Sequence, residues 1–179
     1  MFPLQLIHSK SARMGLRYLL IGGHAVNTYG EPRATLDIDF LVPKADAPKW
    51  QALLLAEGFK LLHDGGNFLQ FSPPYGVSWR FDLMLVTEDT FAKLLAGSKQ
   101  TTCLDIQTRV PSPEHLIALK LHAMTHGSLD RFEKDFGDIL NIARNTGLDA
   151  DSPAMLEIFR RYGTPHTHET FRKRLKPKA

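Results

Sequence analysis

A chain of 179 residues with 43% hydrophobic and 23% charged side chains is long enough for one globular domain with its own core. No apolar run approaches the roughly 20 residues that span a bilayer, and the first ten residues lack the basic segment and long apolar stretch of a signal peptide. The single cysteine, Cys103, excludes an internal disulfide and a multi-cysteine zinc site. We therefore expect a cytoplasmic protein with no membrane partner.

The net charge of +3 is distributed unevenly along the chain. Residues 151–179 contain seven Lys or Arg and three Asp or Glu, which gives a local charge of +4 and leaves −1 for residues 1–150. A basic tail gains affinity for phosphate backbones by releasing counterions, so the tail predicts contact with RNA or tRNA. The alternative interpretation is a solvated terminus that aids solubility.

Apolar periodicity and turn residues predict the secondary structure of the first 110 residues. Helices are expected at residues 4–14, 24–29, 47–57 and 88–96. Strands are expected at residues 17–21, 36–42, 59–62, 68–71 and 79–86, with an extended segment at 101–110.

After Pro111 the pattern becomes helical. Ser112 is a suitable N-cap and Pro113 a suitable first helical residue for a helix over 114–124, and further helices follow from 129–143 onward. The sequence thus predicts an α+β fold, with a mixed, twisted sheet of about five strands flanked by helices in residues 1–110. Residues 111–179 are expected to form a helical segment packed on that core.

Two aspartates on the second of these strands are the first candidates for chemistry. Side chains alternate between the faces of a strand, so Asp37 and Asp39 share one face, about 7 Å apart, while Ile38 and Phe40 share the other. Adjacent carboxylates repel one another, and a divalent cation relieves that repulsion. Carboxylate oxygens with substrate phosphates are the ligands that Mg²⁺ prefers, so the pair predicts a site for Mg²⁺ or Mn²⁺.

A glycine pair upstream supplies a site for phosphate. Gly22 and Gly23 end a strand and open a helix, where bare backbone N–H groups at a helix N-terminus can bind an anion. Arg33 and Thr35 lie just before Asp37 and are placed to contact phosphate as well.

Asp82 is the candidate for a third carboxylate, as a metal ligand or as the general base. It lies inside the apolar strand at 79–86, where an isolated charge is costly unless it is paired. Its ordinary explanation is a partner such as Arg80. With Asp37 and Asp39 it would make a site for one or two metal ions.

The combination resembles the nucleotidyltransferase superfamily, whose signature is Gly-Gly or Gly-Ser followed by Asp-hydrophobic-Asp-hydrophobic. Within it, the chain looks most like the AbiEii/AbiGii-type nucleotidyltransferases, many of which are toxins of toxin–antitoxin pairs. The further matches are His24 within Gly-Gly-His-Ala-Val, Arg33-x-Thr35, the segment 113–120 and the segment 131–140 with Asp135.

The resemblance implies a nucleotidyltransferase fold and roles for two helical residues. Lys120 would neutralise nucleotide phosphate charge, and Asp135 would orient Lys120 or a metal-bound group. The residues by themselves also fit plainer interpretations, in which Lys120 is a surface lysine beside an apolar stripe and Lys134 pairs with Asp138 on a charged helix face.

The function that follows is metal-dependent transfer of a nucleoside monophosphate from an NTP to a hydroxyl of tRNA or other RNA, a protein or a small molecule. By the resemblance, the chain would also be a toxin with a cognate antitoxin. One alternative is a non-catalytic nucleotide- or RNA-binding module on the same fold. A glycosyltransferase, which also uses Asp-x-Asp, fits less well because of the glycine pair and Asp82.

Overall fold

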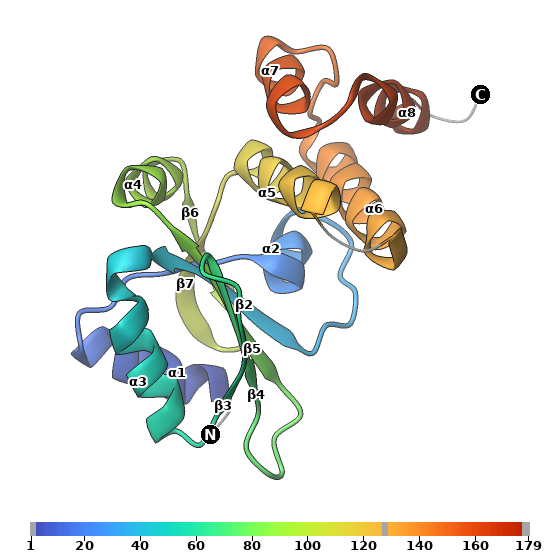
Figure 1. Cartoon of the computed structure of the whole chain (residues 1–179). Helices are drawn as coiled ribbons and strands as arrows, with labels where there is room; N and C mark the ends of the chain where they lie inside the picture. The colour runs from blue at the N-terminus through green and yellow to red at the C-terminus, as the bar shows by residue number, and fades with distance from the viewer. Residues whose placement is uncertain (1–2, 127–128, 177–179) are drawn as a thin grey trace. The chain divides into compact units, whose positions relative to one another are not determined.

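The computed structural model describes residues 3–126 and 129–176, and the chain divides into two compact units (Figure 1). Unit 1 comprises residues 1–25 and 33–111, and unit 2 comprises residues 26–32 and 112–179. Helix α2 (Gly22–Tyr29) contributes its first residues to unit 1 and its last to unit 2. Among the described residues, no helix is both long enough and apolar enough to cross a membrane.

Unit 1 is built on a five-stranded mixed sheet with the strand order β1-β2-β5-β4-β3. Strands β2 and β5 are parallel, and the other neighbours are antiparallel. The strands are β1 (Leu19–Leu20), β2 (Asp37–Pro43), β3 (Lys60–Asp64), β4 (Phe68–Ser72) and β5 (Arg80–Val86). The predicted fold class, a mixed sheet of about five strands flanked by helices, is confirmed.

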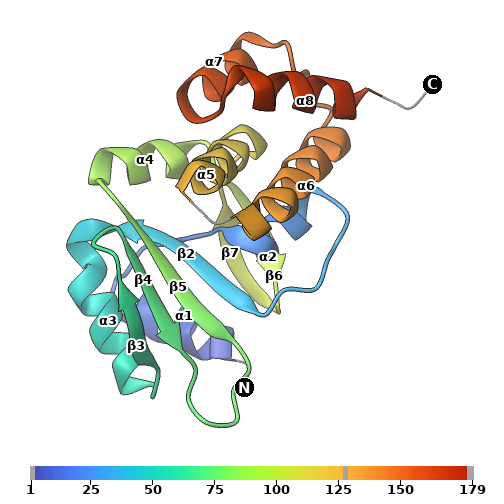
Figure 2. The ribbon, with the colours of Figure 1, turned by 45° about the vertical axis from the view of Figure 1, so that its right-hand side comes forward.

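One face of this sheet is covered by α1 (Pro3–Arg13) and α3 (Ala47–Ala56), which lie together on the same side in Figures 1 and 2. A one-turn helix, η1 (Lys44–Asp46), leads into α3. Trp50 of α3 packs edge-on against Phe40 of β2, which in turn packs edge-on against Phe81 of β5. All three side chains are fully buried, so this aromatic core fixes which face of β2 and β5 points away from α3.

Helix α4 (Glu88–Ala96) begins at an N-cap, because Thr87 Oγ1 accepts a hydrogen bond from the N–H of Thr90. The guanidinium of Arg17 binds Glu88 through two hydrogen bonds of 2.7 and 2.8 Å and lies over the ring of Phe91. These contacts attach α4 to the segment that precedes β1.

The predicted extended segment at 101–110 is wrong in one respect, because it is a hairpin of two strands. Strands β6 (Lys99–Cys103) and β7 (Ile106–Val110) pair antiparallel and form a separate two-stranded sheet. The turn is made by Leu104 and Asp105, whose φ values are 48° and 63°. Tight hairpin turns with positive φ usually contain Gly or Asn, so this turn lacks the usual sequence signal.

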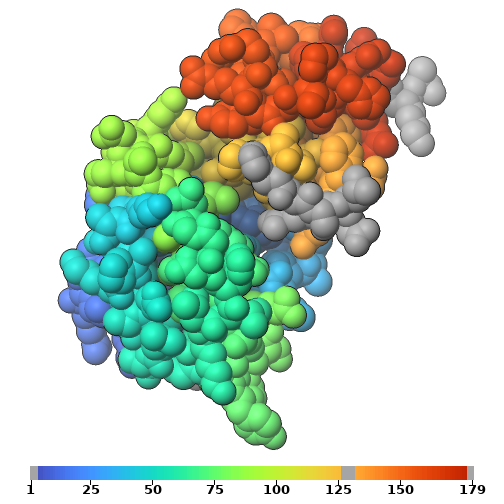
Figure 3. All heavy atoms as spheres, viewed as in Figure 1, coloured from blue at the N-terminus to red at the C-terminus, as the bar shows by residue number. Residues whose placement is uncertain are grey.

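The segment between β4 and β5, residues 73–79, projects from the surface of unit 1 in Figure 3. Tyr75 within it is fully exposed.

Unit 2 consists of the end of α2 and four helices. These are α5 (Pro113–His126), α6 (Leu129–Thr146), α7 (Pro153–Tyr162) and α8 (Pro165–Leu175). The predicted N-cap of α5 is confirmed, since Ser112 Oγ accepts a hydrogen bond from the N–H of His115 at 3.2 Å. Ser152 and Thr164 cap α7 and α8 in the same way, each followed by a proline at the first helical position.

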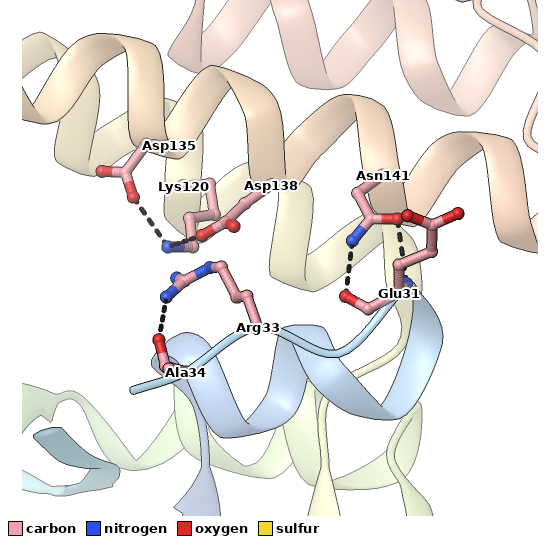
Figure 4. A network of polar contacts seen from close by, with 7 residues as sticks. All are labelled: Glu31, Arg33, Ala34, Lys120, Asp135, Asp138 and Asn141. Carbon is pink, nitrogen blue, oxygen red and sulfur yellow. Dashed lines mark hydrogen bonds and ion pairs between the residues drawn. The ribbon is translucent and has the colours of Figure 1, made fainter. Parts of the chain in front are cut away.

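An asparagine clamp within unit 2 holds the chain after α2. Asn141 of α6 donates from Nδ2 to the carbonyl of Glu31 and accepts from the N–H of Glu31 at its Oδ1, both at 3.0 Å (Figure 4). Asn145 also donates to Asn141 Oδ1 at 2.8 Å. A Cβ on Gly30 would lie 2.6 Å from Asn141 Cγ, so the clamp requires glycine at that position.

We predict that Asn141→Ala lowers the free energy of unfolding by about 1–3 kcal/mol, because it leaves the N–H and carbonyl of Glu31 without these partners. Urea denaturation measures the change. Asn67→Ala is the matched control, since the Asn67 side chain is exposed and accepts one hydrogen bond from Lys44. Equal effects of the two substitutions would contradict the clamp.

Candidate active site

The three predicted carboxylates lie on one face of the sheet of unit 1. Asp39 of β2 is in register with Asp82 of β5, and Asp37 is in register with Arg80. Partners in adjacent strands lie about 4.8 Å apart and point to the same face. Asp37, Asp39 and Asp82 are partly exposed there, while Ile38, Phe40, Phe81 and Leu83 on the opposite face are fully buried.

The N-terminus of α2 lies directly against Asp39. A Cβ on Gly22 would be 1.9 Å from Asp39 Oδ2, and Gly22 has a φ of +62° that other residues rarely adopt. The N–H of Ile21, one residue earlier, donates to the carbonyl oxygen of Asp39 at 2.9 Å. The negative carboxylate therefore sits at the positive end of the α2 dipole, which stabilises its charge.

The second glycine makes the next contact. A Cβ on Gly23 would lie 2.8 Å from the Oγ1 of Thr35, so the bare backbone of α2 and the Thr35 side chain are packed together. Arg33 is partly exposed on the same loop, and its Nη1 donates to the carbonyl of Ala34 at 3.4 Å. The structure thus brings Gly22, Gly23, Thr35 and Asp39 together.

The third residue of α2, His24, is stacked on an aromatic ring. Its imidazole lies parallel to the indole of Trp79, with ring centroids 5.3 Å apart, and it is buried. Burial lowers the pKa of His24, the nearby positive charge of Arg33 lowers it further, and Asp37 acts in the opposite direction. The ring is therefore held in its neutral form at neutral pH. No local sequence pattern marks Trp79 as a partner of His24.

The partner of Asp82 is a residue of β4 that was not predicted from the sequence. Gln70 of β4 is in register with Asp82, and its Nε2 donates to Asp82 Oδ2 at 3.3 Å. The signal was present in the alternation of β4, where a polar residue stands between the buried residues Leu69 and Phe71. Asp82 therefore lies between Asp39 of β2 and Gln70 of β4 in a row of polar residues across the sheet.

No group of three or more His, Cys, Asp or Glu side chains is arranged to hold a metal ion in the part of the chain that the structure describes. The three-carboxylate metal site consequently stays a prediction. The donor set nonetheless suits Mg²⁺, which is commonly bound by one or two carboxylates together with substrate phosphates rather than by a cage of protein ligands.

Lys120 and Asp135 meet within unit 2 in a buried ion cluster. Lys120 Nζ lies 2.7 Å from Asp135 Oδ1 and 2.7 Å from Asp138 Oδ2, and Figure 4 shows it between the two carboxylates of α6. The exposed fractions are 7% for Lys120, 1% for Asp135 and 3% for Asp138, so the interpretation of Lys120 as a surface lysine is wrong. Asp138 follows Asp135 by three residues and so lies on the same helix face, where both carboxylates reach Lys120.

Five of the seven basic residues of the C-terminal segment are held in ion pairs with acidic residues of unit 2. The pairs that the structure describes are Arg160 and Arg161 with Glu157, Arg172 with Asp151, Lys173 with Glu169, and Arg174 with Glu133. Hydrogen bonds from Arg160 and Arg161 lower the pKa of Glu157 to about 2. Lys178 lies outside the described residues. Contact of this segment with RNA stays a prediction.

The chain belongs to a nucleotidyltransferase family. Residues 4–169 match the sequence profile of the family described as "Uncharacterised nucleotidyltransferase". This confirms the predicted superfamily and the prediction of a nucleotidyltransferase enzyme. No curated protein sequence matches the chain.

Solved structures support the fold. The chain is similar to ANT(2")-Ia in complex with adenylyl-2"-tobramycin, with a TM-score of 0.63, 14% identity and 97% of each chain covered. It is similar to the lincomycin-bound lincosamide antibiotic adenylyltransferase LnuA, with a TM-score of 0.56, 17% identity and coverage of 78% of this chain and 95% of the other. An antigenic nucleotidyltransferase-like protein from Paracoccidioides brasiliensis gives a TM-score of 0.53 and 17% identity, over 97% of this chain and 91% of the other.

We predict that Gly22→Ala lowers the free energy of unfolding by about 2–5 kcal/mol, through positive-φ strain and the overlap with Asp39. Gly137→Ala is the matched control, because nothing lies within 4 Å of a Cβ there and alanine favours the α6 helix by about 1 kcal/mol. Chemical denaturation of both variants checks the difference. A Gly22→Ala protein as stable as the Gly137→Ala protein would contradict the contact.

We also predict that Lys120→Met costs about 3–5 kcal/mol of stability, because it leaves two buried carboxylates without their lysine. Adding Asp135→Asn and Asp138→Asn to that variant should restore part of the loss. Lys134→Met, at an exposed position of α6, is the control. If Lys120→Met unfolds at the same denaturant concentration as the control, the buried cluster does not stabilise unit 2.

Proposed function

We propose that this chain transfers a nucleoside monophosphate from an NTP to a hydroxyl acceptor and releases pyrophosphate. The observation that carries the proposal is the placement of Asp37, Asp39 and Asp82 on one partly exposed face, with the N-terminus of α2 packed against Asp39. Membership of a nucleotidyltransferase family supports the same reaction.

Asp37 and Asp39 are the proposed ligands of Mg²⁺ or Mn²⁺. Both are carboxylates on one face of β2, and their oxygens are the hard donors that such cations prefer. A cation bound there would supply positive charge to the triphosphate and to the departing pyrophosphate. Asp82 is either a third ligand or the general base.

The triphosphate is proposed to bind at the start of α2. Gly22 and Gly23 present backbone N–H groups at the positive end of the helix, and no side chain on either residue blocks the approach. Arg33 would add a cation, and the hydroxyl of Thr35 would add a hydrogen bond. His24 would contribute as a neutral group, given its burial and its stacking on Trp79.

In the transfer step, the acceptor oxygen forms a bond to the α-phosphorus while the bond from that phosphorus to the bridging oxygen of the β-phosphate breaks. The electron pair leaves with pyrophosphate, and the acceptor proton passes to the Asp82 carboxylate where Asp82 acts as base. Gln70 holds one oxygen of that carboxylate in place. The residues thus act mainly by positioning and by balancing charge.

Lys120 and Asp135 keep a proposed role through the resemblance to the AbiEii/AbiGii-type enzymes. Lys120 would offer its charge to nucleotide phosphate, and Asp135 would fix its position. The 2.7 Å ion pair between them supports the orienting role of Asp135. The second carboxylate, from Asp138, supports a contribution of the same cluster to stability.

The identity of the acceptor molecule and of any protein partner is also a proposal. LnuA is an adenylyltransferase of lincosamide antibiotics, and the ANT(2")-Ia structure contains an adenylylated tobramycin, which supports a small-molecule acceptor. The basic C-terminal segment supports RNA or tRNA. A toxin role with a cognate antitoxin is supported by the sequence motifs around His24 and Lys120.

We predict that the chain, supplied with Mg²⁺ and each α-labelled NTP, transfers label to an acceptor, and that Asp39→Asn reduces the rate by about 10²-fold or more. Total cell RNA, total protein and a collection of hydroxyl-bearing small molecules are tested side by side. Asp89→Asn, at an exposed position of α4, should leave the rate unchanged. Transfer that persists in Asp39→Asn would overturn the mechanism, and a wild-type chain that labels none of the acceptors would favour the non-catalytic module.

A further inference from the structure

A row of polar side chains crosses the sheet of unit 1 from β2 to its edge. Asp39 of β2 lies opposite Asp82 of β5. Asp82 lies opposite Gln70 of β4, and Gln70 lies opposite His63 of β3. Since paired residues of adjacent strands point to the same face, Asp39, Asp82 and Gln70 share the face that carries the proposed chemistry. A register shift in β3 between Leu61 and His63 brings His63 opposite Gln70 at the end of this row.

The row is accessible and continues beyond the proposed catalytic carboxylate. His63 is exposed, and Gln70 and Asp82 are partly exposed, whereas the other face is filled by the aromatic core under α3. The hydrogen bond from Gln70 to Asp82 Oδ2 joins the outer half of the row to the reacting carboxylate. A molecule that follows the row would thus have one end at Asp82.

An apolar row runs beside the polar one on the same face. Met84 of β5 and Phe68 of β4 lie opposite one another, and both are partly exposed. Met84 is two residues from Asp82, and Phe68 is two residues from Gln70. Such a strip has hydrogen-bonding groups along one edge and an apolar surface along the other. This is the pattern of small-molecule sites, where a few polar groups fix the orientation of a ligand on an apolar lining.

The charges along this strip do not suit a polyanion. The polar row contains no Lys or Arg; Lys60 lies at the outer corner opposite Ser72, and Arg80 lies opposite Asp37. In unit 2, the described arginines of α7 and α8 are held in ion pairs. Binding of a nucleic-acid backbone depends on several cations that release counterions, and the row offers none.

We infer that Gln70, His63, Phe68 and Met84 form an acceptor-binding strip and that the acceptor is a polyhydroxylated small molecule of the sugar or cyclitol class. The inference rests on the proposed function for its reaction, in which the acceptor hydroxyl nearest Asp82 receives the nucleotidyl group. The Gln70 amide offers both a donor and an acceptor to neighbouring hydroxyls, as does the imidazole of His63. The C–H face of the ring lies on Phe68.

The test measures binding directly, so it does not depend on turnover. Glucose, glucosamine and myo-inositol at millimolar concentration are titrated into the ¹⁵N-labelled chain with Mg²⁺ and a non-hydrolysable NTP, and amide resonances are followed by NMR. We expect one of these probes to shift the Gln70 side-chain amide signals. Gln70→Leu and His63→Ala should each weaken its binding about tenfold, the loss of one hydrogen bond.

Gln107→Leu is the matched control, because Gln107 is an exposed glutamine on β7. His63→Ala changes an exposed side chain, so it keeps the test informative if Gln70→Leu disturbs Asp82. Binding that shifts the Gln70 signals without any transfer of label would support the strip and count against the proposed reaction. An RNA oligonucleotide that shifts these signals when no sugar does, or sugar binding unchanged in both variants, would overturn the strip.

Discussion

The contact between Gly22 and Asp39 is the constraint on which the arrangement of unit 1 depends. A helix can begin this close to a strand carboxylate only where there is no side chain, and only with the positive φ that Gly22 adopts. The hydrogen bond from Ile21 to the Asp39 carbonyl fixes the same register from the backbone side. As a result, the positive end of α2 lies against the Asp39 carboxylate, which is where we propose that the triphosphate and the cation bind.

The carboxylates of the chain fall into two physical classes. Asp135 and Asp138 are buried and each lies 2.7 Å from Lys120, whose positive charge offsets part of theirs within unit 2. Asp37, Asp39 and Asp82 are partly exposed on the sheet face opposite the core, whereas the residues next to them along β2 and β5 are fully buried. Carboxylates kept together at a surface position repel one another, and this cost is expected where a ligand offsets it. The contrast supports a binding role for the second class and a structural contribution from the first.

The sequence predicted what depends on local pattern and missed what depends on pairing between distant segments. Alternation along β2 was sufficient to place Asp37 and Asp39 on the face opposite Phe40, and the isolated charge in an apolar strand was sufficient to single out Asp82, which the structure places in register with Asp39. The mixed sheet of about five strands was also predicted. Gln70 and Trp79 were missed because their partners, Asp82 and His24, are set by strand register and by packing. The β6–β7 hairpin was missed because Leu104 and Asp105 adopt positive φ without a glycine. The asparagine clamp on Glu31 joins residues 110 positions apart, which no local pattern reveals.

The most direct test of the central claim is a crystal structure of the chain with Mg²⁺ and an NTP analogue whose bond between the α- and β-phosphates cannot be cleaved. The account predicts phosphate oxygens that accept hydrogen bonds from the backbone N–H groups at the start of α2, with the cation held by Asp37, Asp39 and those phosphates. A nucleotide bound away from Gly22 and Gly23, or a cation that contacts neither aspartate of β2, would contradict it.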